Sequence, residues 1–165
     1  MPYNIGVAFE QKFKEDWYKS FPNSLCFKIY NNQSGYLEIN NYCDFICYDG
    51  KRMYMIDCKS HKGASFPLSA FPQFERLNGL KTIPNLITGI VLWLYEKDKV
   101  YFIPTYTFEK AKNNKLKSIN PKTIDRELYY ILEIPSVKLR TFMNSDYSVL
   151  TEVLDYNTYT GESKS

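Results

Sequence analysis

Two acidic residues and a lysine near the middle of the chain have types and a spacing that suit metal-ion chemistry. Asp44 stands in one apolar stretch, and Asp57 and Lys59 stand in the next, with the hairpin signal Asp49-Gly50 between them. Side chains alternate along a strand, so Asp57 and Lys59 share one face. A two-residue turn makes Asp44 a diagonal neighbour of Asp57 on that face, about 7–8 Å away, and a four-residue turn keeps the same parity. A three-residue turn would separate the acids.

Two carboxylates and an ammonium group suit a hard cation with oxygen ligands. Mg²⁺ is usually held by one or two carboxylates together with water and substrate phosphate. Such an ion lowers the pKa of a bound water and neutralises charge on phosphorus. Lys59 can position or deprotonate that water, or stabilise the added negative charge. The alternative is a plain ion pair between Asp57 and Lys59 on a solvent-exposed sheet face.

Two further polar residues stand beside the apolar stripes of predicted helices. At about 100° per residue, Glu10 lies at the edge of the stripe that contains Phe13 and Trp17. A carboxylate there needs a lysine, a metal or a metal-bound water as its partner, unless it reaches solvent. Gln73 lies on the same side of its helix as Leu77, where it faces the site or bonds to the backbone.

The cysteines have a superficial zinc spacing, with Cys43 and Cys47 in one stretch and Cys58 near His61 in the next. In a strand, Cys43 and Cys47 would be about 13 Å apart, whereas two thiolates on one zinc are about 4 Å apart. We therefore expect both to be small core residues. Without an export signal, we expect free thiols rather than disulfides.

The predicted elements that must position these residues alternate between helix and strand. We expect a helix over 4–20 capped by Asn4, a second helix over 69–78 capped by Ser69 and ended by Gly79, and a helix or loop over 108–117. We expect strands over 25–30, 43–48, 52–59, 86–95 and 100–103. The segments 31–41 and 60–67 are expected to be loops. Beyond Pro121 the pattern is weak. This order predicts an α/β fold with a mixed sheet.

Length and composition agree with one folded unit. The chain has 165 residues, of which 44% are hydrophobic and 17% aromatic, and its net charge of +3 permits a nucleic-acid partner without requiring one. The longest apolar run, 86–95, is too short to span a bilayer, and the N-terminus has no export signal, so we expect a cytoplasmic protein with no membrane partner. No Walker A or Rossmann glycine pattern is present, so no nucleotide cofactor is expected.

Asp44 followed by Asp57-Cys58-Lys59 resembles the PD-(D/E)XK nuclease motif, with Cys43 at the place of the usual proline. Residues 4–10, 56–68 and 72–77 are similar to RecU-type Holliday-junction resolvases. This resemblance implies a central mixed β-sheet flanked by helices. It implies one nuclease domain over 1–165, with a core at about 4–105 and a C-terminal part, 106–165, that is assigned less specifically.

The same resemblance implies a homodimeric endonuclease that nicks four-way DNA junctions symmetrically and needs Mg²⁺, with Mn²⁺ as a substitute. Asp44 and Asp57 would be metal ligands, with the Cys58 carbonyl as a third. Lys59 would be the catalytic lysine. Glu10 would be the helix-borne acid that contacts the metal or its water, and Gln73 would match a glutamine of the family.

Two departures from the family pattern stand out. The second acid is Asp57, where these resolvases more often carry Glu. Bacterial members also have a long basic stalk, whereas the segment 31–41 is short and has no basic residue. The chain is thus similar to a compact, phage-encoded branch of the family. Candidate DNA contacts are Lys51, Arg52, Lys62 and the lysines of 110–122.

Three other functions compete with this interpretation. One is a restriction or repair nuclease of the same fold, acting on duplex or flap DNA. Another is a DNA-binding module whose catalytic site is vestigial. The third is an interaction protein in which the acids and Lys59 form a structural ion pair.

Overall fold

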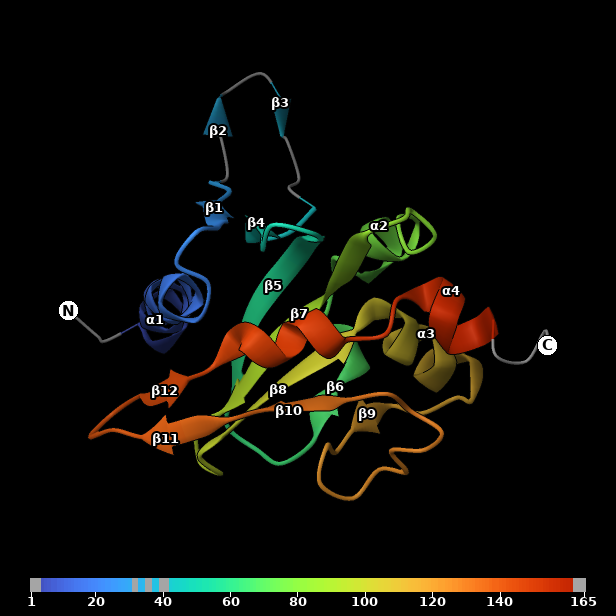
Figure 1. Ribbon diagram of the computed structural model, residues 1–165. Helices are drawn as coiled ribbons and strands as arrows, with labels where there is room; N and C mark the ends of the chain where they lie inside the picture. Colours follow the sequence, from blue (N-terminus) through green and yellow to red (C-terminus); the bar gives the residue numbers. More distant parts are fainter. Residues whose placement is uncertain (1–3, 31–32, 35–36, 39–41, 162–165) are drawn as a thin grey trace.

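The computed structural model describes residues 4–30, 33–34, 37–38 and 42–161, and its centre is a six-stranded sheet (Figure 1). The strand order is β1-β4-β5-β7-β8-β10, and only the β5–β7 pair is parallel. Its strands are β1 (Leu25–Lys28), β4 (Phe45–Tyr48), β5 (Met53–His61), β7 (Leu86–Leu94), β8 (Lys99–Pro104) and β10 (Leu132–Ile134). The predicted α/β fold with a mixed central sheet and flanking helices is confirmed.

Helices and short strand pairs surround this sheet. The α-helices are α1 (Ile5–Ser20), α2 (Phe74–Asn78), α3 (Thr105–Asn113) and α4 (Tyr156–Gly161), and the 3₁₀ helices are η1 (Leu68–Ala70) and η2 (Tyr147–Glu152). The short strands are β2 (Gln33–Ser34), β3 (Leu37–Glu38), β6 (Phe66–Pro67), β9 (Ser118–Ile119), β11 (Ser136–Lys138) and β12 (Met143–Ser145). Within the described residues, no helix is long and apolar enough to cross a membrane.

The first helix forms where the apolar spacing predicted it. The Asn4 side chain caps α1 by accepting a hydrogen bond from the backbone N–H of Val7 at 3.2 Å. Phe9, Phe13 and Trp17 recur every four residues and are all buried against the sheet. This packing holds α1 beside β1 and β5, which is what places the polar edge of the helix near the strand ends.

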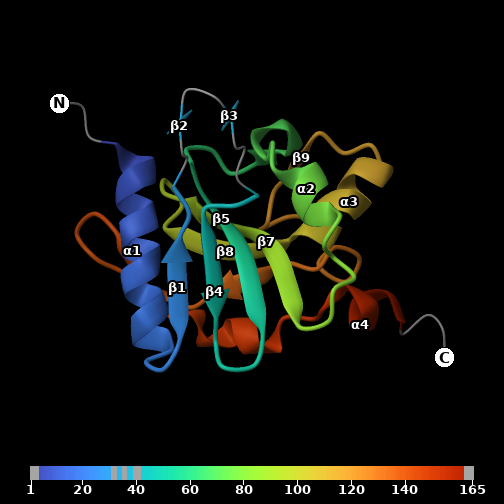
Figure 2. The ribbon, with the colours of Figure 1, turned by 90° about the horizontal axis from the view of Figure 1, so that it is seen from above.

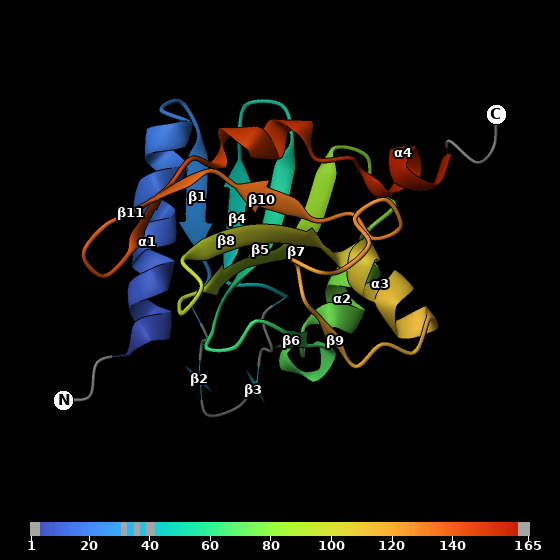
Figure 3. The same cartoon turned by 90° about the horizontal axis from the view of Figure 1, so that it is seen from below.

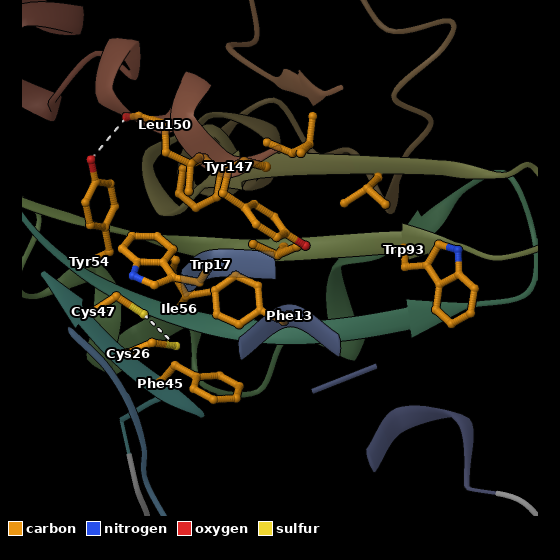
Figure 4. Packing of buried hydrophobic residues seen from close by; sticks show 14 of the residues in the cluster. Phe13, Trp17, Cys26, Phe45, Cys47, Tyr54, Ile56, Trp93, Tyr147 and Leu150 are labelled. Carbon is orange, nitrogen blue, oxygen red and sulfur yellow. Dashed lines mark hydrogen bonds between the residues drawn. The ribbon is translucent and has the colours of Figure 1, made fainter. Parts of the chain in front are cut away.

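The C-terminal part of the chain completes this core. Tyr147 and Leu150 of η2 are buried with Phe13, and the Tyr54 hydroxyl oxygen lies 3.3 Å from the Leu150 carbonyl oxygen (Figure 4). η2 contacts α1, and both pack against the face of the sheet that carries this core (Figure 3). Residues beyond Pro121, for which the sequence carried only a weak pattern, therefore form part of the main core.

The other face of the sheet is covered unevenly. α2 and α3 contact β7, whereas no helix lies over β1, β4 and β5 in Figure 2. Leu25, Phe27, Tyr48 and Met53 are exposed on this uncovered part. Leu25 pairs with Tyr48, and Tyr48 pairs with Met53, so these side chains lie in neighbouring register positions.

The helix expected over 69–78 is interrupted. The chain forms η1 first, and α2 begins only at Phe74, because Pro72 disfavours helical backbone at the residue before it. Ser69 is therefore not the helix cap, and Gln73 takes the position before the first helical residue. Gly79 ends the helix as predicted.

Other boundaries differ for reasons of strand pairing. β5 continues to His61 because it pairs in parallel with β7 as far as Leu94, and β6 pairs with β9, so 60–67 is not all loop. In the predicted loop 31–41, β2 pairs with β3, and the other positions lie outside the described residues. α3 begins at Thr105, earlier than expected.

Candidate active site

A four-residue turn sets the register of the two strands that carry the acids. Tyr48 pairs with Met53, and Asp49 accepts hydrogen bonds from the backbone N–H groups of the two residues before Met53, each at 2.8 Å. Gly50 has a φ of 106°, which glycine adopts without strain. The register continues with Asp44 opposite Asp57 rather than diagonal to it. The prediction that both acids share one face is confirmed.

Each acid is hydrogen-bonded to the backbone of the opposite strand. The Asp44 N–H donates to Oδ1 of Asp57 at 2.9 Å, and the Cys58 N–H donates to Oδ2 of Asp44, also at 2.9 Å. These bonds fix the orientation of both carboxylates.

Asp57 is held in a costly environment. Its side chain is 0% exposed, and its Oδ2 has no hydrogen-bond partner, although Lys59 Nζ lies 3.6 Å away. Burial and the charge of Asp44 raise the pKa of Asp57 to about 7, against the opposing effect of Lys59. A buried carboxylate with a free oxygen and a strongly shifted pKa indicates a ligand site more than a stabilising ion pair.

Lys59 is positioned by two groups from different elements. Its Nζ donates to Oε1 of Gln73 at 3.3 Å and lies 3.6 Å from Oδ2 of Asp57. Gln73 immediately precedes α2, so the interrupted helix brings its amide to the end of β5. The structure thus brings together Asp44, Asp57, Lys59 and Gln73, as the sequence predicted.

Glu10 joins this group through a lysine that the sequence analysis did not select. Oε2 of Glu10 lies 2.9 Å from Nζ of Lys28, at the end of β1. Burial is the main factor that raises the pKa of Glu10, and the Asp44 charge adds to it. Lys28 could have been found, because alternation along β1 places it on the same face as the buried Cys26, where a lysine needs a partner.

A pocket of about 280 Å³ opens where these elements meet. Its lining residues come from α1, from β1 and the chain after it, from the start of the hairpin and from the residue before α2: Glu10, Lys28, Ile29, Tyr30, Cys43, Asp44 and Gln73. Asp57 lies buried and does not line the pocket, while its neighbour Asp44 does. Tyr30 is a second pocket residue that the sequence analysis did not select.

The donors present fit a hard divalent cation better than zinc. Within the described ranges, no group of three or more His, Cys, Asp or Glu side chains is assembled for a metal. Two carboxylates, Asp44 and Asp57, with one buried oxygen unpartnered, match the few protein ligands that Mg²⁺ takes. The Cys58 side chain packs against the core, and desolvation there holds the pKa of its thiol well above the usual range, so the thiol stays protonated. A role for the Cys58 carbonyl stays a prediction.

The predicted DNA contacts lie at different ends of the hairpin. Lys51 and Arg52 belong to its turn, roughly 13 Å or more along β5 from Asp57. The Arg52 guanidinium donates to the carbonyls of Leu150 and Val153, which ties the turn to the C-terminal segment. Lys62 is exposed and follows directly after β5, at the opposite end of that strand from the turn and as many residues from Asp57 as Arg52 is.

Comparison with known proteins finds a likeness in fold alone. No protein-family model and no curated protein sequence matches the chain. The structure is similar to that of Hjc, a Holliday junction resolvase from the archaeal hyperthermophile Archaeoglobus fulgidus, with a TM-score of 0.54 and 20% sequence identity. The match covers 78% of this chain and 95% of Hjc.

Proposed function

We propose that this chain is a Mg²⁺-dependent endonuclease that resolves four-way DNA junctions by paired symmetric nicks. The observation that carries the proposal is the facing pair Asp44 and Asp57, in which a fully buried carboxylate keeps one oxygen without a hydrogen bond beside Lys59. The similarity in fold to a Holliday junction resolvase and the nuclease-like spacing of these residues support it.

In this proposal Asp44 and Asp57 hold the metal, with the Cys58 carbonyl as a further ligand. When bound, Mg²⁺, or Mn²⁺ in its place, supplies positive charge at the phosphate and lowers the pKa of a water. Oδ2 of Asp57 has no hydrogen bond within the chain, and a cation held by Asp57 would reduce the cost of burying that oxygen.

The chain's own side chains then act on the phosphodiester. Lys59, held by Gln73 at 3.3 Å, donates to the attacking water or to a phosphate oxygen and stabilises the charge that develops there. Glu10 orients the water, and Lys28 keeps Glu10 in place from the opposite side. In-line attack leaves a 5′-phosphate and a 3′-hydroxyl, as the resemblance implies.

Paired nicks require two sites, so we propose a homodimer as well. We assign the second copy to the uncovered face of β1, β4 and β5, where Leu25, Phe27, Tyr48 and Met53 are exposed. Exposed apolar side chains in neighbouring register positions are the kind of surface that a second copy would cover. Phe27→Glu is expected to convert a dimer into a monomer in sedimentation-velocity experiments. A wild-type protein that sediments as a monomer would contradict the assignment.

The test of the nuclease compares wild type with Asp57→Asn on a labelled four-way junction, an intact duplex and a flap, each with and without Mg²⁺. Asp98→Asn is the matched control, since Asp98 is exposed and pairs with Lys138 far from the site in sequence and register. Paired nicks near the exchange point are expected only with Mg²⁺, in wild type and the control.

Other outcomes would separate the rival functions. Cutting of duplex or flap but not the junction would indicate a restriction or repair nuclease. Metal-independent binding to the junction without any cutting would indicate a DNA-binding module. If the protein neither cuts nor binds any of the three DNAs, a nucleic-acid function is excluded.

A further inference from the structure

Tyr30 is one of the residues that line the pocket of about 280 Å³ next to Asp44, which we call the acid pocket. Among the large apolar and aromatic side chains of the described residues it is the most exposed, at 76%. A single exposed aromatic residue needs no explanation on its own. This one, however, lines the same pocket as Asp44, Gln73 and Lys28, so its ring is available to whatever enters there.

The lining of the pocket combines charged and aromatic groups. It includes the polar side chains of Glu10, Asp44 and Gln73 and the exposed ring of Tyr30. Lys28 links the two kinds of group, because its Nζ lies 2.9 Å from Glu10 Oε2 and 6.0 Å from the centre of the Tyr30 ring. A ligand that contacts both must carry a charged group next to a flat apolar one, and a nucleotide has that chemistry.

The size of the pocket limits what can enter. At about 280 Å³ it lies just below the usual range for small-molecule sites, which begins at about 300 Å³. That volume suits one nucleotide that has left its stack. It does not suit a stacked base pair, which is larger and has both of its faces covered by neighbours.

We propose that Tyr30 stacks on the base of a nucleotide that has left its stack, beside the phosphate that lies at Asp44 and Asp57. This inference rests on the proposed nuclease function and adds a base-binding subsite to it. In regular duplex DNA both faces of each base are stacked, and a face becomes free only where stacking is interrupted, as at an exchange point or a flap. Stacking on Tyr30 therefore selects branched over continuous DNA without reading the base sequence.

The experiment measures single-turnover cleavage of a four-way junction by Tyr30→Ala, Tyr30→Leu and Tyr30→Phe. Base–aromatic stacking is worth about 1–3 kcal/mol per base, so the Ala and Leu variants are expected to cut about 5- to 160-fold more slowly at subsaturating enzyme. Phe keeps the ring and is expected to stay within twofold. Val137→Ala, at a position that is 68% exposed on β11, is the control and is expected to match wild type.

A second measurement reads binding without catalysis. In an Asp57→Asn background, Tyr30→Ala is expected to weaken binding to a fluorescein-labelled junction while leaving binding to an intact duplex of the same length unchanged. Because Tyr30 is exposed, all three variants are expected to keep the wild-type unfolding temperature.

Several results would overturn the inference while leaving the nuclease in place. These are unchanged cleavage by Tyr30→Ala, full activity of Tyr30→Leu, or a loss in Tyr30→Phe as large as in Tyr30→Ala. The second would indicate apolar contact with a sugar, and the third would indicate a role for the hydroxyl. If wild type cuts no DNA at all, the proposed function fails and the stacking subsite fails with it.

Discussion

At the turn end of the β4–β5 hairpin, the carboxylate of Asp49 accepts three hydrogen bonds, whereas Asp57 at the other end accepts one. The donors to Asp49 are the N–H groups of Lys51 and Arg52, each at 2.8 Å, and the Tyr54 hydroxyl at 2.6 Å. Burial acts to raise the pKa of Asp49, but these hydrogen bonds hold it below its usual value. At Asp57, burial dominates and the pKa rises to about 7.

The difference shows what each end of the same hairpin does. At the turn, both oxygens of Asp49 accept hydrogen bonds within the chain, and Arg52 extends the network to the C-terminal carbonyls. That arrangement stabilises the fold. At the acid end, one carboxylate oxygen is left buried without a hydrogen bond, which costs stability unless a ligand supplies the partner. Unsatisfied groups of this kind are typical of sites shaped for binding rather than for folding.

Removing the charge at each end should have opposite consequences. Asp57→Asn is expected to reduce junction cleavage by at least about 100-fold while the unfolding temperature stays equal or rises, because it removes a buried charge whose desolvation the ion pair with Lys59 offsets only in part. Asp49→Asn is expected to keep cleavage within about threefold and to lower the stability by about 1 kcal/mol. Cleavage assays and urea unfolding measure both. Equal loss of activity in the two variants would contradict the comparison.

The structural role of the turn end is tested by Arg52→Ala. Leaving the Leu150 and Val153 carbonyls without their charged donor is expected to cost about 2–4 kcal/mol in the free energy of unfolding. Below the unfolding transition, cleavage should remain close to wild type. Arg52→Lys is the control that keeps the charge, and it should recover only part of the loss because its compact ammonium lacks the planar, widely spaced donors of the guanidinium. A DNA-binding defect without a stability defect would instead support the predicted DNA contact.

The acid end should make stability depend on pH in metal-free protein. Asp57 has a pKa of about 7 when folded and close to 3.8 when unfolded, so between these values the folded state holds the extra proton. The stability is therefore fully present below about pH 4 and falls as the pH rises towards 7. Urea unfolding in EDTA should show this fall, on the order of a few kcal/mol. In Asp57→Asn the fall should largely disappear, and a wild-type stability that rises from pH 4 to 7 would contradict it.

Mg²⁺ should offset the stability that is lost when Asp57 is ionised in the folded protein. An ion that binds only the folded state raises the unfolding temperature by mass action, with a gain of about 2.7 kcal/mol at one hundred times the dissociation constant. Thermal unfolding at pH 7.5 is expected to shift upward with Mg²⁺ in wild type and in Asp49→Asn. In Asp57→Asn the shift should vanish, and a shift of equal size there would place the ion elsewhere.

The smallest expected effects concern the two exposed lysines that flank the hairpin ends. Lys62→Ala, just after β5, is expected to weaken junction binding about two- to tenfold and to lower by about one the number of counterions released on binding. Lys51→Ala, at the turn, is expected to change binding less than twofold. Fluorescence anisotropy over a salt series measures both, and a larger effect at Lys51 would move the DNA path towards the turn.

Much of the site could be predicted because it depends on local pattern. Alternation along two strands joined by a short turn placed Asp44 on the same face as Asp57 and Lys59, and the four-residue spacing of α1 placed Glu10 at the edge of the core. The prediction of a helix over 69–78 was only partly right. Pro72 disfavours helical backbone at the residue before it, and the spacing of apolar residues does not show this effect.

The sequence by itself determined which residues share a face, because side-chain period follows from the geometry of one element. Only the tertiary structure decided which distant groups meet: Lys28 with Glu10, Arg52 with the C-terminal carbonyls, and Tyr30 with the acid pocket. These contacts depend on how β1 pairs with β4, how β5 runs parallel to β7, and where the C-terminal segment returns to the core. Such pairings are set by the packing of the whole chain, since a local pattern specifies a face but not its partner.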